Sequence, residues 1–287
     1  MQQKKAPAKQ GDKEQPKVYS VKKDVIFKIF FADERNSAFL IDFLKFTLDI
    51  PHEEYGEVHI VDPHLIREFP TDKLGIIDVK LKTVSGNTIH IEIQRKPSYK
   101  MEKRIAFYSS KMVTEQIGSS EQYYNLKKVI SIVITEKEFL PGSPDYHHCF
   151  TMYDKKRHVE LYDLIETHTL ELNKLPTIED GSRLHHWMKF IKAEGEEEMA
   201  AVAKIDPMFK AAVVKLFELS ADEKTRLIYE LREKQRMDEA ALEEGAREEI
   251  REELNVIIAE QKSALAEKDT TIEELRAQLA ALRTPKA

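Results

Sequence analysis

The stretch LGIIDVKLKTVSGNTIHIEIQ, residues 74–94, decides the fold. Its apolar residues alternate over 74–83 and again over 88–94, which is the period of a β-strand. Between the two runs, Ser85-Gly86-Asn87 has the composition of a hairpin loop. The sequence therefore predicts two antiparallel strands, each with one acid among apolar neighbours, Asp78 in the first and Glu92 in the second.

These two acids need a compensating partner, because burying an ionised carboxylate is costly without a cation or several donors. If the strands pair, Asp78 and Glu92 can converge at one end or face of the sheet. Two carboxylates suit Mg²⁺, which prefers oxygen ligands and keeps several waters. A bound metal polarises a phosphoryl oxygen and lowers the pKa of a coordinated water, as phosphodiester hydrolysis requires.

Gln94 follows Glu92 at the two-residue period of a strand, so both side chains lie on the same side. An amide can orient an attacking water through a hydrogen bond. The alternative is that Glu92 and Gln94 lie on the exposed face of an amphipathic strand, with Ile89, Ile91 and Ile93 facing the core. The strand pattern is compatible with both interpretations.

A basic segment follows these strands. Residues 95–111 hold six basic side chains and one acidic one, a local charge of +5. The pattern predicts a helix over 100–118, on which Arg104, Tyr108 and Lys111 share one face. That face can bind phosphate, with arginine as a bidentate donor and lysine as a point charge, or it is a solvated basic surface. Lys73 is a further candidate for phosphate or for pairing with a site carboxylate.

The other elements follow from periodicity and from helix and strand boundary signals. We expect helices over 21–32, with Ser20 as N-cap, and over 37–48, and strands near 58–62, over 128–136, from about 158, and over 167–176. After residue 180 the pattern is helical throughout. Glu171, near the end of the last strand, is either a site acid or, as the pattern favours, a surface residue.

The C-terminal tail has heptad character. Apolar residues occupy a positions at Ile258, Leu265, Ile272 and Leu279 and d positions at Leu254, Leu275 and Leu282, while Gln261 and Lys268 interrupt the d series. This predicts a coiled coil of about four heptads. Self-association is favoured over an isolated helix, because an unpaired apolar stripe would be exposed. Residues 193–283 carry 14 basic and 23 acidic residues, a charge of −9, so the net acidity belongs to this region.

Composition limits the class of protein. The chain has 287 residues, of which 41% are hydrophobic, enough for a core, and a single cysteine excludes an internal disulfide or a cluster of thiolate ligands. No run approaches the length of a membrane span, and the polar N-terminus has no apolar segment typical of a signal peptide. We therefore expect a cytoplasmic protein with no membrane partner.

Several motifs in order resemble a known family. They are KKDVIFKIFF (22–31), TDKLGIIDVKLKTVSGNTIHIEIQ (71–94), RIAFYSSKMVTEQIGSSEQYYNL (104–126), VISIVIT (129–135) and LELNKLP (170–176). Together they resemble the PD-(D/E)XK nuclease superfamily, and within it the recombination-promoting nuclease (Rpn) group, also described as PD-(D/E)XK nuclease family transposases. The resemblance covers about residues 18–245. The chain lacks the proline before the first acid, and Gln94 replaces the usual lysine.

This resemblance implies roles for individual residues. Asp78 and Glu92 would bind the divalent metal, Mg²⁺ or Mn²⁺, and Gln94 would orient the water. Asp24 matches the acid of the N-terminal helix motif, where it would make a further metal or water contact. The alternative for Asp24 is an ion pair with Lys28, four residues on, along a helix surface.

The expected architecture is an α/β, restriction-endonuclease-like mixed sheet flanked by helices. Residues 1–17 form a disordered tail, 18–180 the nuclease-like core, 181–245 a helical region that packs on or links the core, and 246–287 the coiled coil. The expected function is a metal-dependent DNA endonuclease in recombination, mobile elements or defence against foreign DNA, homo-oligomeric through residues 250–283. The alternatives are an RNase with the same site, or a weakly active nuclease-like scaffold that binds DNA or protein.

Overall fold

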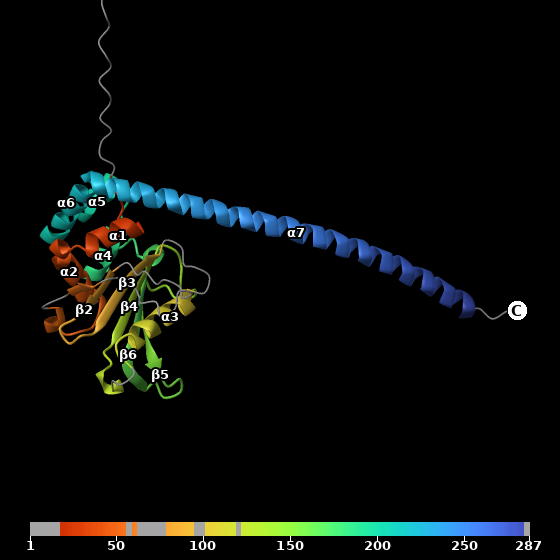
Figure 1. The fold of residues 1–287 in the computed structure, drawn as a ribbon, viewed down its shortest axis with the longest axis horizontal. Coiled ribbons are helices and arrows are strands. Elements are labelled where there is room, and N and C mark those ends of the chain that lie inside the picture. Colours follow the sequence, from red (N-terminus) through yellow and green to blue (C-terminus); the bar gives the residue numbers. More distant parts are fainter. Residues whose placement is uncertain (1–17, 56–58, 62–78, 95–100, 119–121, 284–287) are drawn as a thin grey trace, which may run out of the picture. The chain divides into compact units, whose positions relative to one another are not determined.

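A mixed six-stranded sheet forms the centre of the protein (Figure 1). The computed structural model describes residues 18–55, 59–61, 79–94, 101–118 and 122–283. The strand order is β1-β2-β3-β4-β6-β5. The strands are β1 (His59–Val61), β2 (Val79–Lys82), β3 (Thr88–Gln94), β4 (Val129–Thr135), β5 (His147–Tyr153) and β6 (Glu160–Glu171).

The three inner strands β3, β4 and β6 run parallel, and the outer strands pair antiparallel. The predicted hairpin is present: β2 pairs with β3, and Val79 lies opposite Ile91. Gly86 in its loop has φ +88, a conformation that residues with a Cβ rarely adopt. Every residue of β4 is buried, as expected for a central parallel strand covered on both faces.

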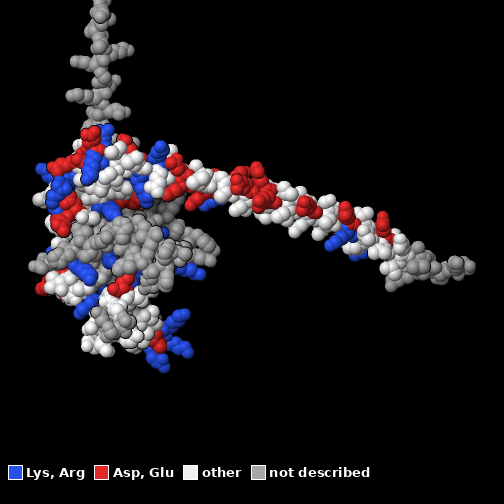
Figure 2. Space-filling view, viewed as in Figure 1, with Lys and Arg blue, Asp and Glu red and all other residues white. Residues whose placement is uncertain are grey.

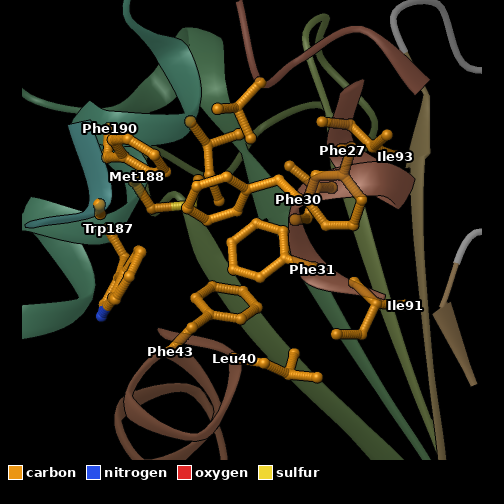
Figure 3. Close-up of a cluster of buried hydrophobic side chains, with 14 of the residues drawn as sticks. Phe27, Phe30, Phe31, Leu40, Phe43, Ile91, Ile93, Trp187, Met188 and Phe190 are labelled. Carbon is orange, nitrogen blue, oxygen red and sulfur yellow. The ribbon is translucent and has the colours of Figure 1, made fainter. Parts of the chain in front are cut away.

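One face of the sheet is covered by helices from both ends of the core sequence. These are α1 (Asp24–Phe31), α2 (Ser37–Thr47), α4 (Arg183–Lys192), α5 (Gly195–Val202) and α6 (Pro207–Ala221). Their aromatic side chains pack against Ile91 and Ile93 of β3 in one continuous core (Figure 3). The largest buried members are Phe27, Phe30, Phe31, Phe43, Trp187, Phe190 and Phe209. The helical segment after residue 180 therefore contributes directly to this core.

The other face is covered by α3 (Met101–Thr114), which joins β3 to β4. Two smaller clusters lie beneath it, Tyr108 and Met112 on Val129, and Met101 and Ile105 on Val133. Parallel strands need such a crossover helix, since a tight turn cannot join them. The expected α/β architecture, a mixed sheet flanked by helices, is confirmed.

Two local expectations are wrong. Helix α1 begins at Asp24 with Lys23 as N-cap, whereas Ser20 donates its hydroxyl to the Ala193 carbonyl at 2.8 Å. The strand expected from 158 and the first part of the one expected over 167–176 form a single strand, β6, which ends at Glu171, and its antiparallel neighbour β5 was not expected. Strand β5 reads HHCFTMY, and its edge position does not require the β-branched residues that mark a buried strand.

Helix α7 (Glu223–Arg283) is a single helix of 61 residues. The chain divides into two compact units, Met1–Tyr229 and Glu230–Ala287, so the boundary falls inside α7. Acidic side chains cluster along the helix (Figure 2). No helix in the described ranges is long and apolar enough to cross a membrane.

Candidate nuclease site

Glu92 is the acid that the strand pattern marked, and it is buried. Its neighbours Ile89, Ile91 and Ile93 point into the large core, so Glu92 projects from the opposite face of β3, beneath α3. The amphipathic interpretation was right about the isoleucines. It was wrong about exposure, because only 2% of Glu92 is accessible to solvent.

Two side chains donate hydrogen bonds to the same oxygen of the Glu92 carboxylate. Gln94 Nε2 donates to Glu92 Oε1 at 2.6 Å, and Arg104 Nη2 of α3 donates to the same atom at 2.8 Å. A charge-assisted hydrogen bond from arginine supplies the positive charge that a buried carboxylate requires. The structure therefore brings together three residues that the sequence singled out separately.

Arg104 connects this carboxylate to the helix surface. Its side chain is 39% exposed, and its guanidinium lies 5.1 Å from the centre of the Tyr108 ring. The Nε atom of Arg104 is buried and has no hydrogen-bond partner among the residues that the structure describes. The partly exposed guanidinium uses Nη2 on Glu92, and its other N–H groups can donate to a phosphate oxygen.

Tyr108 and Lys111 differ in exposure. Tyr108 is 7% exposed and packs against Met112 and Val129, which leaves little of it for a bound nucleic acid. Lys111, in the last turn of α3, is partly exposed. Of the predicted phosphate contacts on α3, Arg104 and Lys111 are thus the more accessible.

The start of α1 lies at the carboxyl end of β3. Glu136 N, directly after β4, donates to Gln94 O at 3.1 Å, and Lys22 Nζ lies 2.9 Å from Glu136 Oε1 and 2.7 Å from Glu194 Oε1. Burial opposes the charge of Lys22, but the two carboxylates outweigh it and raise the pKa of the ammonium. Asp24, half-buried and two residues from Lys22, is thereby placed at the same end of the sheet as Gln94.

Sequence reasoning missed a buried polar chain on the Glu92 face. His90 Nε2 makes a short hydrogen bond to Ser131 Oγ, which lies 2.7 Å from Ser109 Oγ. Burial, and secondarily Lys80, lower the pKa of His90 to about 3, so the ring is neutral at pH 7. The signal was present, because His90 shares the strand period of Glu92 and Gln94.

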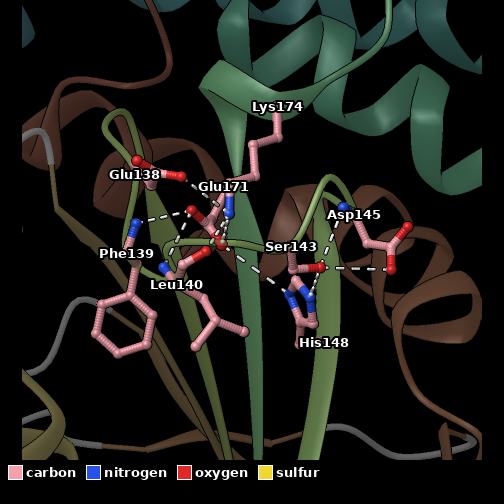
Figure 4. Close-up of polar contacts among 8 residues, drawn as sticks. All are labelled: Glu138, Phe139, Leu140, Ser143, Asp145, His148, Glu171 and Lys174. Carbon is pink, nitrogen blue, oxygen red and sulfur yellow. Dashed lines mark hydrogen bonds and ion pairs between the residues drawn. The ribbon is translucent and has the colours of Figure 1, made fainter.

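Glu171 is fully buried, contrary to the surface position expected for it. It accepts from Phe139 N at 2.7 Å and Leu140 N at 3.3 Å, and Lys174 Nζ donates to it at 3.0 Å (Figure 4). Although Glu171 pairs in register with Thr135 at the end of β4, its charge is already compensated. It anchors the loop after β4, and we assign it no catalytic role.

Asp78 and Lys73 lie outside the described residues. Among the residues described at this end of the sheet, the carboxylates of Glu92 and Asp24 are donors suited to a divalent cation. Both are hard oxygen ligands of the kind that Mg²⁺ prefers. Among the described residues, the ion pair of Glu92 is with Arg104 and engages one carboxylate oxygen, so the residues present fit a divalent metal at this position.

A family model described as PD-(D/E)XK nuclease family transposase matches residues 21–246. A search of curated proteins and a search of solved structures each find no match.

Proposed function

We propose a function from the premise that this chain belongs to the PD-(D/E)XK nuclease family transposases. Its domain is nuclease-like, and the specific activity proposed is divalent-metal-dependent hydrolysis of phosphodiester bonds within DNA. The observation that carries the proposal is a buried carboxylate, Glu92, joined on one oxygen by Gln94 and Arg104. A fold that needed only a core would gain nothing from this burial.

Each residue of the site has its own role in the proposed hydrolysis. Glu92, with Asp78 and Asp24, would hold Mg²⁺ or Mn²⁺, and the ion supplies Lewis-acid polarisation of the phosphate and a water of lowered pKa. Gln94 donates its amide N–H to Glu92, which leaves its amide oxygen to accept a hydrogen bond from the attacking water and orient it. Arg104 and Lys111 contact the phosphate backbone, with Tyr108 supporting the Arg104 guanidinium and Lys73 as a further phosphate contact.

One observation favours a second function. The Arg104–Glu92 ion pair satisfies the carboxylate without a metal, and Gln94 stands where a lysine would stabilise developing charge. A chain with this arrangement suits a weakly active scaffold that binds DNA or protein and assembles through α7. The same site chemistry would also serve an RNase.

A plasmid-cleavage assay separates these functions. Supercoiled plasmid is incubated with the full chain and Mg²⁺ or Mn²⁺, beside Glu92→Gln, Asp78→Ala and the control Glu102→Gln, an exposed acid on α3. We expect Glu92→Gln and Asp78→Ala to lose cleavage by on the order of a hundredfold or more, and Glu102→Gln to retain it. Gln94→Lys should cleave faster than the wild type, since an ammonium stabilises phosphate charge better than an amide.

Equal cleavage by all variants would eliminate the nuclease proposal. No cleavage by the wild type, with retained DNA binding, would support the scaffold. A parallel RNA substrate distinguishes an RNase. The roles in recombination, mobile elements or defence belong to this same proposal and rest on family membership alone.

A further inference from the structure

A second group of ligand-type side chains lies on the other face of the sheet, between β5 and β6. Cys149 Sγ, a Glu166 carboxylate oxygen and a His168 ring nitrogen all lie within 4.8 Å of one another. Cys149 and His168 are register partners across the two strands. Leu170, on the same side of β6 as His168, belongs to the large core, whereas Thr167 and Thr169 face the groove beside α3. The cluster is therefore separated from Glu92 by the sheet.

The spacing suits one tetrahedral ion. Zn²⁺ binds sulfur at about 2.3 Å and nitrogen or oxygen at about 2.0–2.2 Å, so tetrahedral ligands stand about 3.6 Å apart for S and N and about 3.3 Å for N and O. Here Cys149 Sγ is 3.7 Å from His168 Nε2, and His168 Nε2 is 2.8 Å from Glu166 Oε1. The first separation already fits, and the second must open by about half an ångström.

The surroundings also match a bound divalent cation. Glu166 is half-buried and lies within hydrogen-bond distance of both His168 and Lys128. Lys128 Nζ lies 2.9 Å from Glu166 Oε2 and 2.6 Å from Asp163 Oδ1. With a Cys149 thiolate, the two carboxylates, Lys128 and a divalent ion, the formal charges cancel.

His147 contacts the other ring nitrogen of His168. Its Nε2 lies 2.9 Å from His168 Nδ1. With its own proton on Nδ1, His147 can accept a hydrogen bond from His168 Nδ1–H, which leaves His168 Nε2 as the metal ligand. This second partner is what fixes the ring tautomer in metal-binding histidines.

We propose that Cys149, Glu166 and His168 form a Zn²⁺ site that ties strand β5 to strand β6, with His147 as a positioning residue and water as the fourth ligand. Its mixed sulfur, nitrogen and oxygen ligands favour Zn²⁺ over the Mg²⁺ expected at Glu92. The single cysteine excluded a cluster of thiolates, but it does not exclude a mixed site. Binding would exchange the Cys149 thiol proton for the metal.

Two measurements on the chelator-treated full chain test this site. Tetrahedral Co²⁺ bound by a thiolate gives a sulfur-to-metal charge-transfer band, which Zn²⁺ should then remove by displacement. We expect this band in the wild type, in Glu92→Gln and in His148→Asn, whose histidine lies on the other side of β5. Cys149→Ser should abolish the band and weaken Zn²⁺ binding about a hundredfold, and His147→Gln should weaken it about tenfold.

The second measurement needs no variant. Cys149 is the sole cysteine and is solvent-exposed, so alkylation of the wild type reports on this thiol alone. Zn²⁺ at saturating concentration should slow alkylation at least tenfold. Alkylation unchanged by Zn²⁺, a missing charge-transfer band, or a band that survives Cys149→Ser would each overturn the proposal, as would a band lost in Glu92→Gln.

Discussion

At the residue scale, the Arg104–Glu92 contact is the feature on which the site depends. A carboxylate with 2% exposure loses nearly all its hydration on folding, and the guanidinium at 2.8 Å replaces that stabilisation. Gln94 adds a neutral donor to the same oxygen. The pair therefore has a structural role in addition to any role in binding phosphate.

Arg104→Ala should destabilise the protein because it leaves the Glu92 charge buried and unpaired. We expect the free energy of unfolding to fall by about 1–2 kcal/mol, less than for a fully buried pair since Arg104 is partly exposed. Urea denaturation measures it, with the exposed neighbour Lys103→Ala as a control that changes stability by less than about 0.5 kcal/mol.

The double variant Arg104→Ala/Glu92→Gln gives the decisive comparison. Removing the charge as well should recover part of the loss, so that the two effects are not additive. Strict additivity would mean that the ion pair contributes nothing to stability. Mg²⁺ should also raise the melting temperature of Arg104→Ala more than that of the wild type, since the metal then replaces the missing cation.

At the scale of elements, one arginine joins three helices. Arg183 at the start of α4 donates to Asp42 of α2 at 2.7 Å and forms a short ion pair with Asp206, the N-cap of α6. Asp206 also accepts from Met208 N at 2.7 Å and Phe209 N at 3.1 Å. Phe209, held by this cap, packs 4.8 Å from the Trp187 ring in the core. Capping and core packing are thus coupled through one carboxylate.

Asp206→Ala should lower stability by about 1–2 kcal/mol at neutral pH, since the cap and the ion pair are both lost. Burial raises the pKa of Asp206, but hydrogen bonds from Arg183, Phe209 N and Met208 N outweigh it and hold the pKa below 3.8. The contribution of a depressed carboxyl is present above its unfolded pKa and is lost as pH falls through its folded pKa. The difference in stability between the wild type and Asp206→Ala should therefore be smaller at about pH 3 than at pH 7.

Thermal unfolding at both pH values measures this gap. Asp206→Asn is the matched variant, because asparagine caps a helix almost as well but carries no charge. It should lose less stability than Asp206→Ala at pH 7. A gap that stays constant on acidification would show that the Asp206 charge makes no contribution.

At the scale of the whole molecule, α7 carries an exposed apolar stripe. Its a-position residues Ile258, Leu265, Ile272 and Leu279 are all exposed in the single chain. Helices derive most of their stability from burying an apolar face, so we predict a partner for this 61-residue, largely solvated helix. The coiled coil and the homo-oligomer remain predictions, and a second copy of α7 is the partner that the heptads favour.

Deletion of residues 250–287 should lower the oligomeric mass measured by light scattering. The paired variant Ile258→Asn/Ile272→Asn should lower it too, because buried amides at a positions weaken the seam. Glu260→Gln, off the a and d positions, is the control that should keep the wild-type mass. An unchanged mass after the deletion would refute self-association through this segment.

Several features were predictable from local sequence because they depend on period alone. The 88–94 strand was located to the residue, and α2 to within one residue, because alternation and helical spacing are read along a short segment. The same period placed Glu92 and Gln94 together and turned Ile91 toward the core. These properties need no knowledge of what lies on either face.

Other features were decided only by tertiary structure, because they depend on which distant segment covers a face. The strand period showed that Glu92 and Ile91 project from opposite faces of the sheet. Only the packing of α3 buries the Glu92 face and brings Arg104 to it. Glu171 was expected at the surface, but in the structure the loop after β4 covers it. The Cys149–His168 cluster needs the register of β5 on β6. The sequence by itself determined the elements and the side of each residue, whereas burial and partnership required contacts between residues far apart in the chain, which no local pattern encodes.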